Sequence, residues 1–181
     1  KRLFTLNAGE WGFSKTGFSP DSKYIAGVSV LGQILIWNLA THTIIDSFKT
    51  KPLTGTFFLS PTANLLCFEN LQGKIITYDI DKRKIISTIV LATKEDVRIA
   101  AFSSNSKMLI ISGEFVSTIW DIATAKKITT IEQESYSVAA TRFGEEDKEA
   151  VIVSSDGMIH YYTIPSGAEN AYLRVDANAV T

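Results

Sequence analysis

The sequence predicts an all-β protein made of four similar units, each about 40 residues long and each with four strands. Four similar segments end on an aromatic residue, and these residues follow at intervals of 41, 42 and 42: Trp37, Tyr78, Trp120 and Tyr162. Short segments rich in Ile, Val, Phe, Tyr and Thr lie between Gly, Pro, Asn, Asp and Ser, which is typical of strands joined by turns. No stretch has the long 3.6-residue apolar period of a helix.

Other positions recur in step with the aromatic residue. Eight residues before it the units carry Ser29, Asn70, Ser112 and Ser154. Five residues before it they carry Gly32, Gly73, Phe115 and Gly157. A tight turn needs positive φ, which glycine adopts without a Cβ clash, so we expect the turn at Phe115 to differ from the other three.

The expected strands follow in order along the four units. They are 15–18, 24–29, 33–39 and 43–48; then 54–59, 65–69, 74–80 and 84–90; then 98–102, 108–112, 116–122 and 127–131; and last 137–143, 150–154, 158–164 and a weakly patterned 171–175. Several of them, such as 34–37, are apolar at consecutive positions, which indicates burial on both faces. Four-stranded sheets buried on both faces are the blades of a β-propeller. A β-sandwich stays an alternative, although a sandwich does not require one shared period.

The repeated unit resembles the WD40 repeat from residue 11 to about residue 175. The closest matches are the Phe-Ser-Pro-Asp turn at 18–21, Trp120-Asp121 and Asp156-Gly157. The Gly-His pair of the family is absent, and Ala8-Gly9-Glu10 is the nearest sequence to it. The buried aspartate of the family's His-Ser-Asp-Trp network is retained only as Asp156, so no unit has the full network.

The repeat period gives an expected number of blades. At this period, 181 residues correspond to about 4.3 units, whereas the resemblance implies rings of seven or eight blades. We therefore expect a single propeller segment, part of a larger ring, with blades at 11–50, 51–92, 93–133 and 134–176. The chain begins at Lys1, and residues 3–6 are expected to be the outer strand of a preceding blade or, alternatively, the strand that closes the last one. An open fan of blades would expose large apolar faces, which favours missing sequence as the source of the other blades.

Composition and charge disfavour several classes of function. With 18 basic and 19 acidic side chains, a partner held by phosphate neutralisation, such as nucleic acid, is not expected. The apolar runs are far shorter than the ~20 residues of a membrane helix, and no leader is seen, so we expect no membrane insertion and a cytoplasmic or nuclear location. One cysteine and two histidines leave little for a metal site, and we expect no metal, no cofactor and no small-molecule substrate.

The residues that could do chemistry fit structural positions. His42 is interpreted as a turn residue, and His160 and Cys67 as packed strand residues. A catalytic triad could be assembled from the residue types of Ser154, His160 and Asp156. However, Ser154 and Asp156 occupy structural positions of the repeat. No catalytic residue is therefore expected. The acidic run at 145–147 is interpreted as a solvated turn.

The resemblance implies that one ring face binds protein subunits or peptides. That face is made by the starts of the first strands and by the residues just before the glycine turns. Carried over to this sequence, the candidate partner-binding residues are Trp11, Ser14, Leu71, Asp96, Arg98, Tyr136 and Ser155. Trp11, Arg98 and Tyr136 are of the types that anchor interfaces, although Trp11 alternatively packs under the next blade. The expected function is a non-enzymatic scaffold in a multiprotein complex.

Two alternatives belong to other classes. A propeller enzyme would need polar residues converging on the central channel, where the sequence offers only Glu10, Asp96 and Glu134. A lipid- or nucleic-acid-binding propeller is disfavoured by the net charge of −1 and by the absence of a Phe-Arg-Arg-Gly motif.

Overall fold

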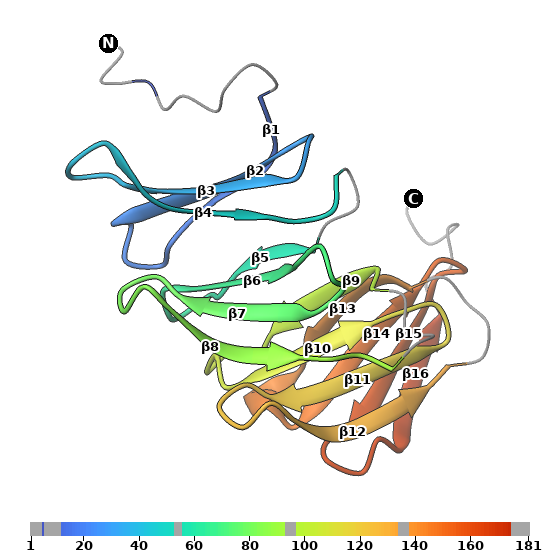
Figure 1. The fold of residues 1–181 in the computed structure, drawn as a ribbon. Helices are drawn as coiled ribbons and strands as arrows, with labels where there is room; N and C mark the ends of the chain where they lie inside the picture. Colours follow the sequence, from blue (N-terminus) through green and yellow to red (C-terminus); the bar gives the residue numbers. More distant parts are fainter. Residues whose placement is uncertain (1–4, 6–11, 53–55, 93–96, 134–137, 175–181) are drawn as a thin grey trace, which may run out of the picture. The chain divides into compact units, whose positions relative to one another are not determined.

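A computed structural model describes residue 5 and residues 12–52, 56–92, 97–133 and 138–174. These residues form four sheets, each with four antiparallel strands in chain order (Figure 1). The first sheet holds β1 (Phe13–Phe18), β2 (Tyr24–Ser29), β3 (Gln33–Asn38) and β4 (Thr43–Lys49). The second holds β5 (Phe57–Leu59), β6 (Leu65–Glu69), β7 (Ile75–Asp79) and β8 (Lys84–Ile89).

The third sheet holds β9 (Ile99–Phe102), β10 (Met108–Ser112), β11 (Val116–Asp121) and β12 (Lys126–Glu132). The fourth holds β13 (Val138–Phe143), β14 (Glu149–Ser154), β15 (Met158–Thr163) and β16 (Glu169–Arg174), and the short 3-10 helix η1 (Glu145–Asp147) lies between β13 and β14. The predicted all-β fold of four four-stranded antiparallel sheets is confirmed. It is consistent with part of a WD40-like propeller.

The chain divides into two compact units, residues 1–91 and residues 92–181. The first unit holds the first and second sheets, and the second unit holds the third and fourth. The fourth sheet has its own fourth strand, β16, which begins two residues earlier than expected. Residues 3, 4 and 6 lie outside the described residues, so the role expected for 3–6 and the blade boundaries stay predictions.

In the first unit, the two sheets pack face to face. The core consists of Ala26, Val28, Ile34 and Ile36 from the first sheet with Phe57, Leu66, Phe68, Ile76, Tyr78 and Ile80 from the second. Successive side chains of a strand point to opposite faces, so Leu35 and Trp37 lie on the other side of β3. There the Phe13 ring meets the Trp37 ring edge-on at 5.2 Å between centroids. The unbroken apolar run in β3 thus serves two faces, as the sequence predicted.

The second unit repeats this packing. Its core consists of Ile110, Ile119 and Ile131 from the third sheet with Val138, Phe143, Ala150, Ile152 and Tyr162 from the fourth. In the first unit, Ile36, just before the aromatic of the first sheet, belongs to the same core as Tyr78, the aromatic of the second sheet. In the second unit, Ile119 and Tyr162 share a core in the same way. The repeat period of 41 or 42 residues therefore reflects how one sheet packs on the next.

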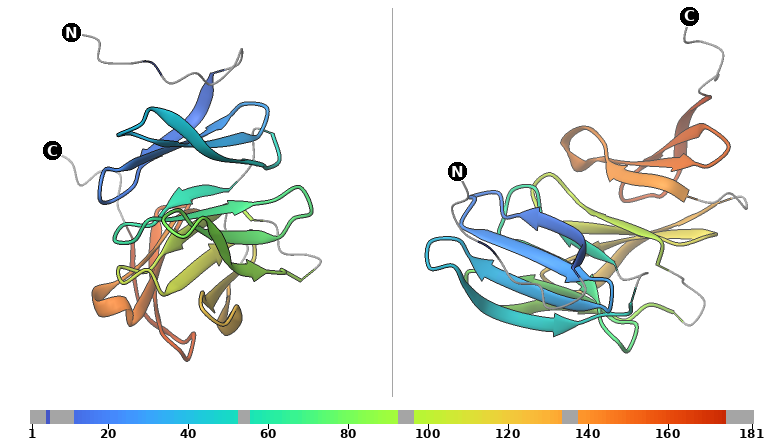
Figure 2. Two further views of the ribbon diagram at one scale, coloured as in Figure 1. Left: turned by 60° about the vertical axis from the view of Figure 1, so that its left-hand side comes forward. Right: turned by 90° about the horizontal axis from the view of Figure 1, so that it is seen from above.

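The glycine and serine positions of the repeat form the turn between the second and third strands. Figure 2 shows the ribbon from two further sides. Gly32, Gly73 and Gly157 have φ of 77°, 75° and 86°. Their amides donate to the carbonyls three residues earlier, at 2.9, 3.0 and 3.1 Å. In the third sheet, the amide of Gly113 instead donates to the carbonyl of Val116 at 2.9 Å. The prediction that the turn containing Phe115 differs is confirmed.

One expectation about a turn is wrong. Asp147, in the acidic run interpreted as a solvated turn, is buried. Its carboxylate accepts hydrogen bonds from the amide and hydroxyl of Ser104, both at 2.8 Å, and from the amide of Asn105 at 3.1 Å. Only Glu145 and Glu146 are exposed. The side chain of Asp147 therefore ties the fourth sheet to the first turn of the third.

In the first unit, a charged cluster joins the two sheets and gives a pH prediction. Asp46 on β4 accepts from the Tyr78 hydroxyl at 2.7 Å and from Nε and Nη2 of Arg83, both at 2.9 Å. These hydrogen bonds, from Arg83 above all, hold the pKa of Asp46 below its usual value. The ionised carboxylate therefore stabilises the fold above about pH 4 and loses this effect as pH falls through the lower folded-state pKa.

We expect Asp46→Asn to lower the free energy of unfolding by about 1 kcal/mol at pH 7, because Arg83 is exposed and its charge is screened. The difference in the free energy of unfolding between wild type and variant should become smaller as the pH is lowered toward 3. Urea unfolding at several pH values would measure it. A difference that stays constant over this range would contradict the assignment.

Candidate functional site

The candidate site is the edge of each sheet at which the first strand begins and the second strand turns into the third; we call it the turn edge. It consists of residues 12–14, 30–32 and 70–73 in the first unit and residues 97–98, 113–115 and 155–157 in the second. Pairing places the two parts side by side: Phe13 pairs with Ser29, and Val138 with Ser154. The amide of Arg98 donates to the carbonyl of Ser112 at 3.0 Å.

The structure describes four of the seven predicted partner-binding residues. Ser14 lies in β1 and Leu71 in the turn between β6 and β7, whereas Arg98 directly precedes β9 and Ser155 lies in the turn between β14 and β15. All four are exposed. The other three, Trp11, Asp96 and Tyr136, lie outside the described residues. So do all three channel candidates of the enzyme alternative, Glu10, Asp96 and Glu134.

Arg98 and Ser14 have local partners at the turn edge. Nη2 of Arg98 lies 3.0 Å from Oε2 of Glu114, which stands in the turn between β10 and β11. Exposed ion pairs of this kind contribute at most about 1 kcal/mol to folding. The hydroxyl of Ser14 donates to the carbonyl of Val28 at 3.0 Å.

Large apolar side chains recur at the tips of these turns. Leu31, Leu71 and Phe115 are 57%, 53% and 54% exposed, in three of the four sheets. A single exposed apolar residue is ordinary, but its recurrence at the same turn of a repeat is not. The sequence analysis named Leu71, which lies seven residues before the aromatic of its unit. It missed Leu31 and Phe115, which lie six and five residues before the aromatics of theirs. The signal that would have found them is a large apolar residue in a turn of polar and small residues.

In the first unit, the two turns lie at one end of the packed sheets. The amide of Thr50, just after β4, donates to the carbonyl of Gly32 at 2.8 Å. Nζ of the next residue, Lys51, lies 2.5 Å from Oε1 of Glu69, at the end of β6. These contacts link the turn of the first sheet to the turn of the second. Leu31 and Leu71 therefore belong to one edge of this unit.

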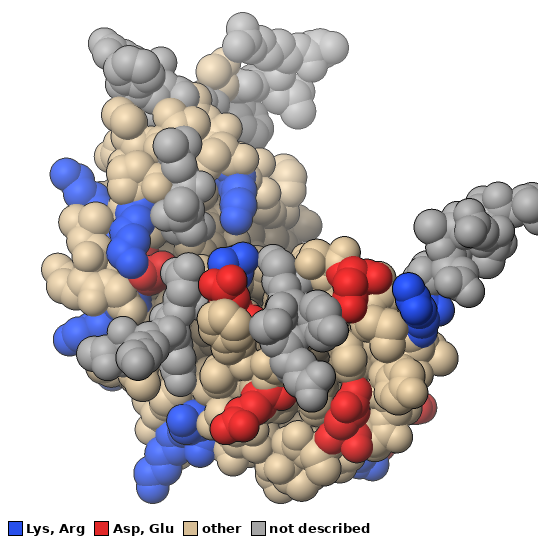
Figure 3. Space-filling model, turned by 90° about the vertical axis from the view of Figure 1, so that its right-hand side faces the viewer, with Lys and Arg blue, Asp and Glu red and all other residues tan. Residues whose placement is uncertain are grey.

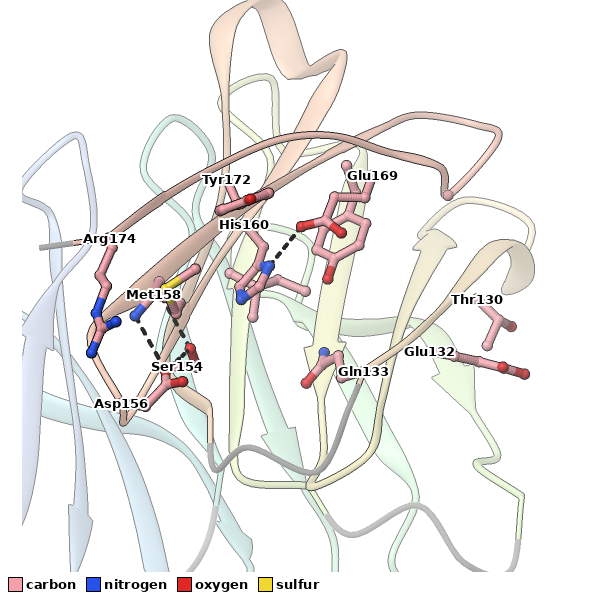
Figure 4. Close-up of a pocket in the computed structure, with 13 residues that line it drawn as sticks. Thr130, Glu132, Gln133, Ser154, Asp156, Met158, His160, Glu169, Tyr172 and Arg174 are labelled. Atoms are coloured by element: carbon pink, nitrogen blue, oxygen red, sulfur yellow. Dashed lines mark hydrogen bonds and ion pairs between the residues drawn. The ribbon is translucent and has the colours of Figure 1, made fainter.

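The second unit also contains a pocket of about 820 Å³ between β12 and the face of the fourth sheet (Figure 4). It is lined by Thr130, Glu132, Gln133, Ile152, Ser154, Asp156, Met158, His160, Tyr162, Gly167, Glu169, Tyr172 and Arg174. Nδ1 of His160 lies 2.6 Å from Oε1 of Glu169. The hydroxyl of Ser154 donates to Asp156 at 2.5 Å, and this bond is the main cause of a lowered pKa at Asp156.

These contacts do not form a catalytic triad. Ser154 donates to Asp156, while His160 pairs with Glu169, and no hydrogen bond between Ser154 and His160 is found in this part of the structure. Cys67 is fully buried, and burial raises the pKa of its thiol to about 12, so it stays protonated at neutral pH. Among the residues described, no three His, Cys, Asp or Glu side chains are grouped to hold a metal ion. Nor does this part of the chain contain a helix long and apolar enough to cross a membrane.

Some of the basic side chains are paired with carboxylates. At the hairpin tip 82–84, Nζ of Lys82 lies 2.7 Å from Asp79, and Arg83 binds Asp46. On the face drawn in Figure 3, the Lys and Arg side chains are interspersed with acidic and uncharged ones. Such a distribution gives no support to the lipid- or nucleic-acid-binding alternative.

A comparison with curated proteins finds a distant relative. The chain is 26% identical over 137 residues to the guanine nucleotide-binding protein subunit beta of Saccharomyces cerevisiae. The match covers 71% of this chain and 32% of that protein. The chain thus spans about a third of the length of the relative. No protein-family model matches the chain.

Proposed function

We propose that this chain is a non-enzymatic protein-interaction scaffold, a WD40-like propeller segment whose turn edges bind a protein subunit or a peptide. The observation that carries the proposal is the recurrence of the exposed apolar residues Leu31, Leu71 and Phe115 at equivalent turns. The similarity to a protein named as a subunit supports it, because a subunit functions in an assembly. The repeated four-stranded sheets support the propeller part of the proposal.

The turn edge has the make-up of a binding surface. Half-exposed leucine and phenylalanine side chains gain about 25 cal/mol for each Å² of apolar surface that a partner removes from water. The same edges carry exposed polar residues suited to a rim, Ser14 in the first unit and Arg98 and Ser155 in the second. The turns are held by backbone hydrogen bonds, so little conformational entropy is lost when a partner docks.

The proposal has three further parts: additional contact residues, the source of the other blades, and the location. Trp11, Asp96 and Tyr136 are proposed as further contacts, because in the sequence they come two or three residues before β1, β9 and β13. The other blades of a ring of seven or eight would come from sequence outside these 181 residues. The proposed location is the cytoplasm or the nucleus, where a subunit with one buried thiol needs no disulfide.

The direct test is a triple variant, Leu31→Ser, Leu71→Ser and Phe115→Ser, assayed against the partner recovered with the wild-type chain from its native source. We expect partner binding to weaken about tenfold or more, because the variant removes the exposed apolar side chains from the turn edges of both units. Each exposed substitution should change the free energy of unfolding by no more than about 0.5 kcal/mol.

The matched control is the double variant Ile44→Ser and Ile85→Ser. These residues are 51% and 46% exposed but stand near the starts of β4 and β8, away from the turn edge. The control should bind the partner as the wild type does. Equal loss in both variants, or full binding by the triple variant, would show that the turn edge is not the interface.

A further inference from the structure

The outer strand of the fourth sheet, β16, has a free edge. It pairs with β15 and with no other strand that the structure describes. All six of its residues are exposed, whereas β4, β8 and β12, the outer strands of the other sheets, each have three residues that are buried or half-buried. The central residues of β16, 170–173, carry no charge and include no proline. Such an edge presents unpaired N–H and C=O groups to a strand of another chain.

One face of this strand borders the pocket of about 820 Å³. A β-bulge interrupts the pairing of β15 with β16 and adds one residue to β16, so Glu169 and Tyr172 both line the pocket although they are three positions apart. Arg174 lines it as well, and Thr130 and Glu132 of β12 line it from the other side (Figure 4). Every second side chain of a strand added to β16 would therefore point to the side of the pocket.

The charges that line the pocket favour a basic group. The carboxylates of Glu132, Asp156 and Glu169 stand against a single guanidinium, that of Arg174. Arg174 lies at the opposite end of the pocket from Glu132, so it does not neutralise that carboxylate (Figure 4). The side chain of Glu132 forms no ion pair or hydrogen bond with another residue that the structure describes. The ring of Tyr172 is 65% exposed, and the face of a tyrosine ring attracts a cation.

We propose that β16 binds an extended segment of a partner protein as a fifth strand, and that a lysine or arginine of this segment enters the pocket beside Glu132, Glu169 and Tyr172. In this mode of recognition, backbone hydrogen bonds to the strand edge supply affinity, and pockets for alternate side chains supply specificity. A residue directly opposite Tyr172 would have its Cβ about 5 Å from that of Tyr172, which brings a basic group to the ring and to the carboxylates. The interaction goes beyond the proposed function, because it uses none of the apolar residues of the turn edge.

The test is an NMR titration of the isotope-labelled chain with the peptide acetyl-Val-Lys-Val-Lys-Val-amide. We expect saturable shifts at the amides of residues 169–174 and at His160, which pairs with Tyr172. The same peptide with glutamate in place of lysine should bind at least about tenfold more weakly, because the carboxylates of the pocket repel it. The lysine peptide methylated at every backbone nitrogen should also bind at least about tenfold more weakly, because it has no N–H to donate to β16.

Variants of exposed residues locate the basic side chain without disturbing the fold. Glu132→Gln and Tyr172→Ala should each weaken binding of the lysine peptide about threefold or more. The matched control is Glu145→Gln, an exposed carboxylate of the same unit that does not line the pocket. It should leave binding of the peptide unchanged.

The triple variant of the turn edge, Leu31→Ser, Leu71→Ser and Phe115→Ser, should bind the lysine peptide as the wild type does. Failure of this interaction and failure of the turn edge are therefore distinguishable. No shift along β16, or equal binding of the lysine peptide and either of the other two peptides, would overturn the proposal. So would binding that Glu132→Gln leaves unchanged.

Discussion

Replacing Gly32 with alanine is expected to lower the free energy of unfolding by about 3 kcal/mol or more. Gly32 has φ of 77°, and a Cβ built on it would lie 2.2 Å from the carbonyl oxygen of Thr50. The left-handed backbone alone costs an alanine roughly 1–2 kcal/mol, and the clash with backbone adds to it. Urea unfolding followed by circular dichroism measures the effect.

Gly73 is the matched control, because it occupies the same turn of the second sheet. Its φ is 75°, but the nearest atom to a built Cβ is Oε1 of Glu69 at 3.7 Å. Gly73→Ala should therefore show only the backbone cost, about 1–2 kcal/mol. Equal losses in the two variants would mean that the segment directly after β4, residues 50–52, does not pass as close to Gly32 as the structure places it.

Replacing Asp147 with alanine is expected to cost about 3 kcal/mol, because it removes the charged carboxylate that accepts hydrogen bonds from two backbone amides and a hydroxyl of the third sheet. Glu146→Ala serves as the control: it also has positive φ, 51° against 59° for Asp147, but its side chain is exposed. The backbone cost is thus matched, and the difference measures the buried carboxylate. Thermal and urea unfolding that give the same loss for both variants would contradict the role assigned to Asp147.

Much of the fold could be predicted because the repeated positions mark turns between neighbouring strands and strands whose side chains are buried on both faces. Gly32 and Gly157 mark turns that need positive φ, and the apolar run before Trp37 marks a strand buried on both faces. Even the exception at Phe115 was visible as a missing glycine. These features depend on neighbours within about ten residues, which a sequence displays directly.

The features that escaped prediction depend on contacts between distant parts of the chain. Asp147 bonds to residues 42 and 43 positions away, so its acidic surroundings gave no hint of burial. The pocket of the second unit is lined by residues of β12 and of the fourth sheet, such as Thr130 and His160, which are far apart in the sequence. Within the candidate site, Leu71 and Arg98 were predicted from columns of the repeat.

Hydrogen exchange on the chain bound to its native partner tests the central claim most directly, because it maps the interface without a substitution. The proposed scaffold predicts slower exchange on binding at the turn edge, in residues 30–32, 70–73 and 113–115. It predicts no change at the opposite turns, 19–23, 60–64 and 103–107. Protection confined to those opposite turns, with unchanged exchange at Leu31, Leu71 and Phe115, would contradict it.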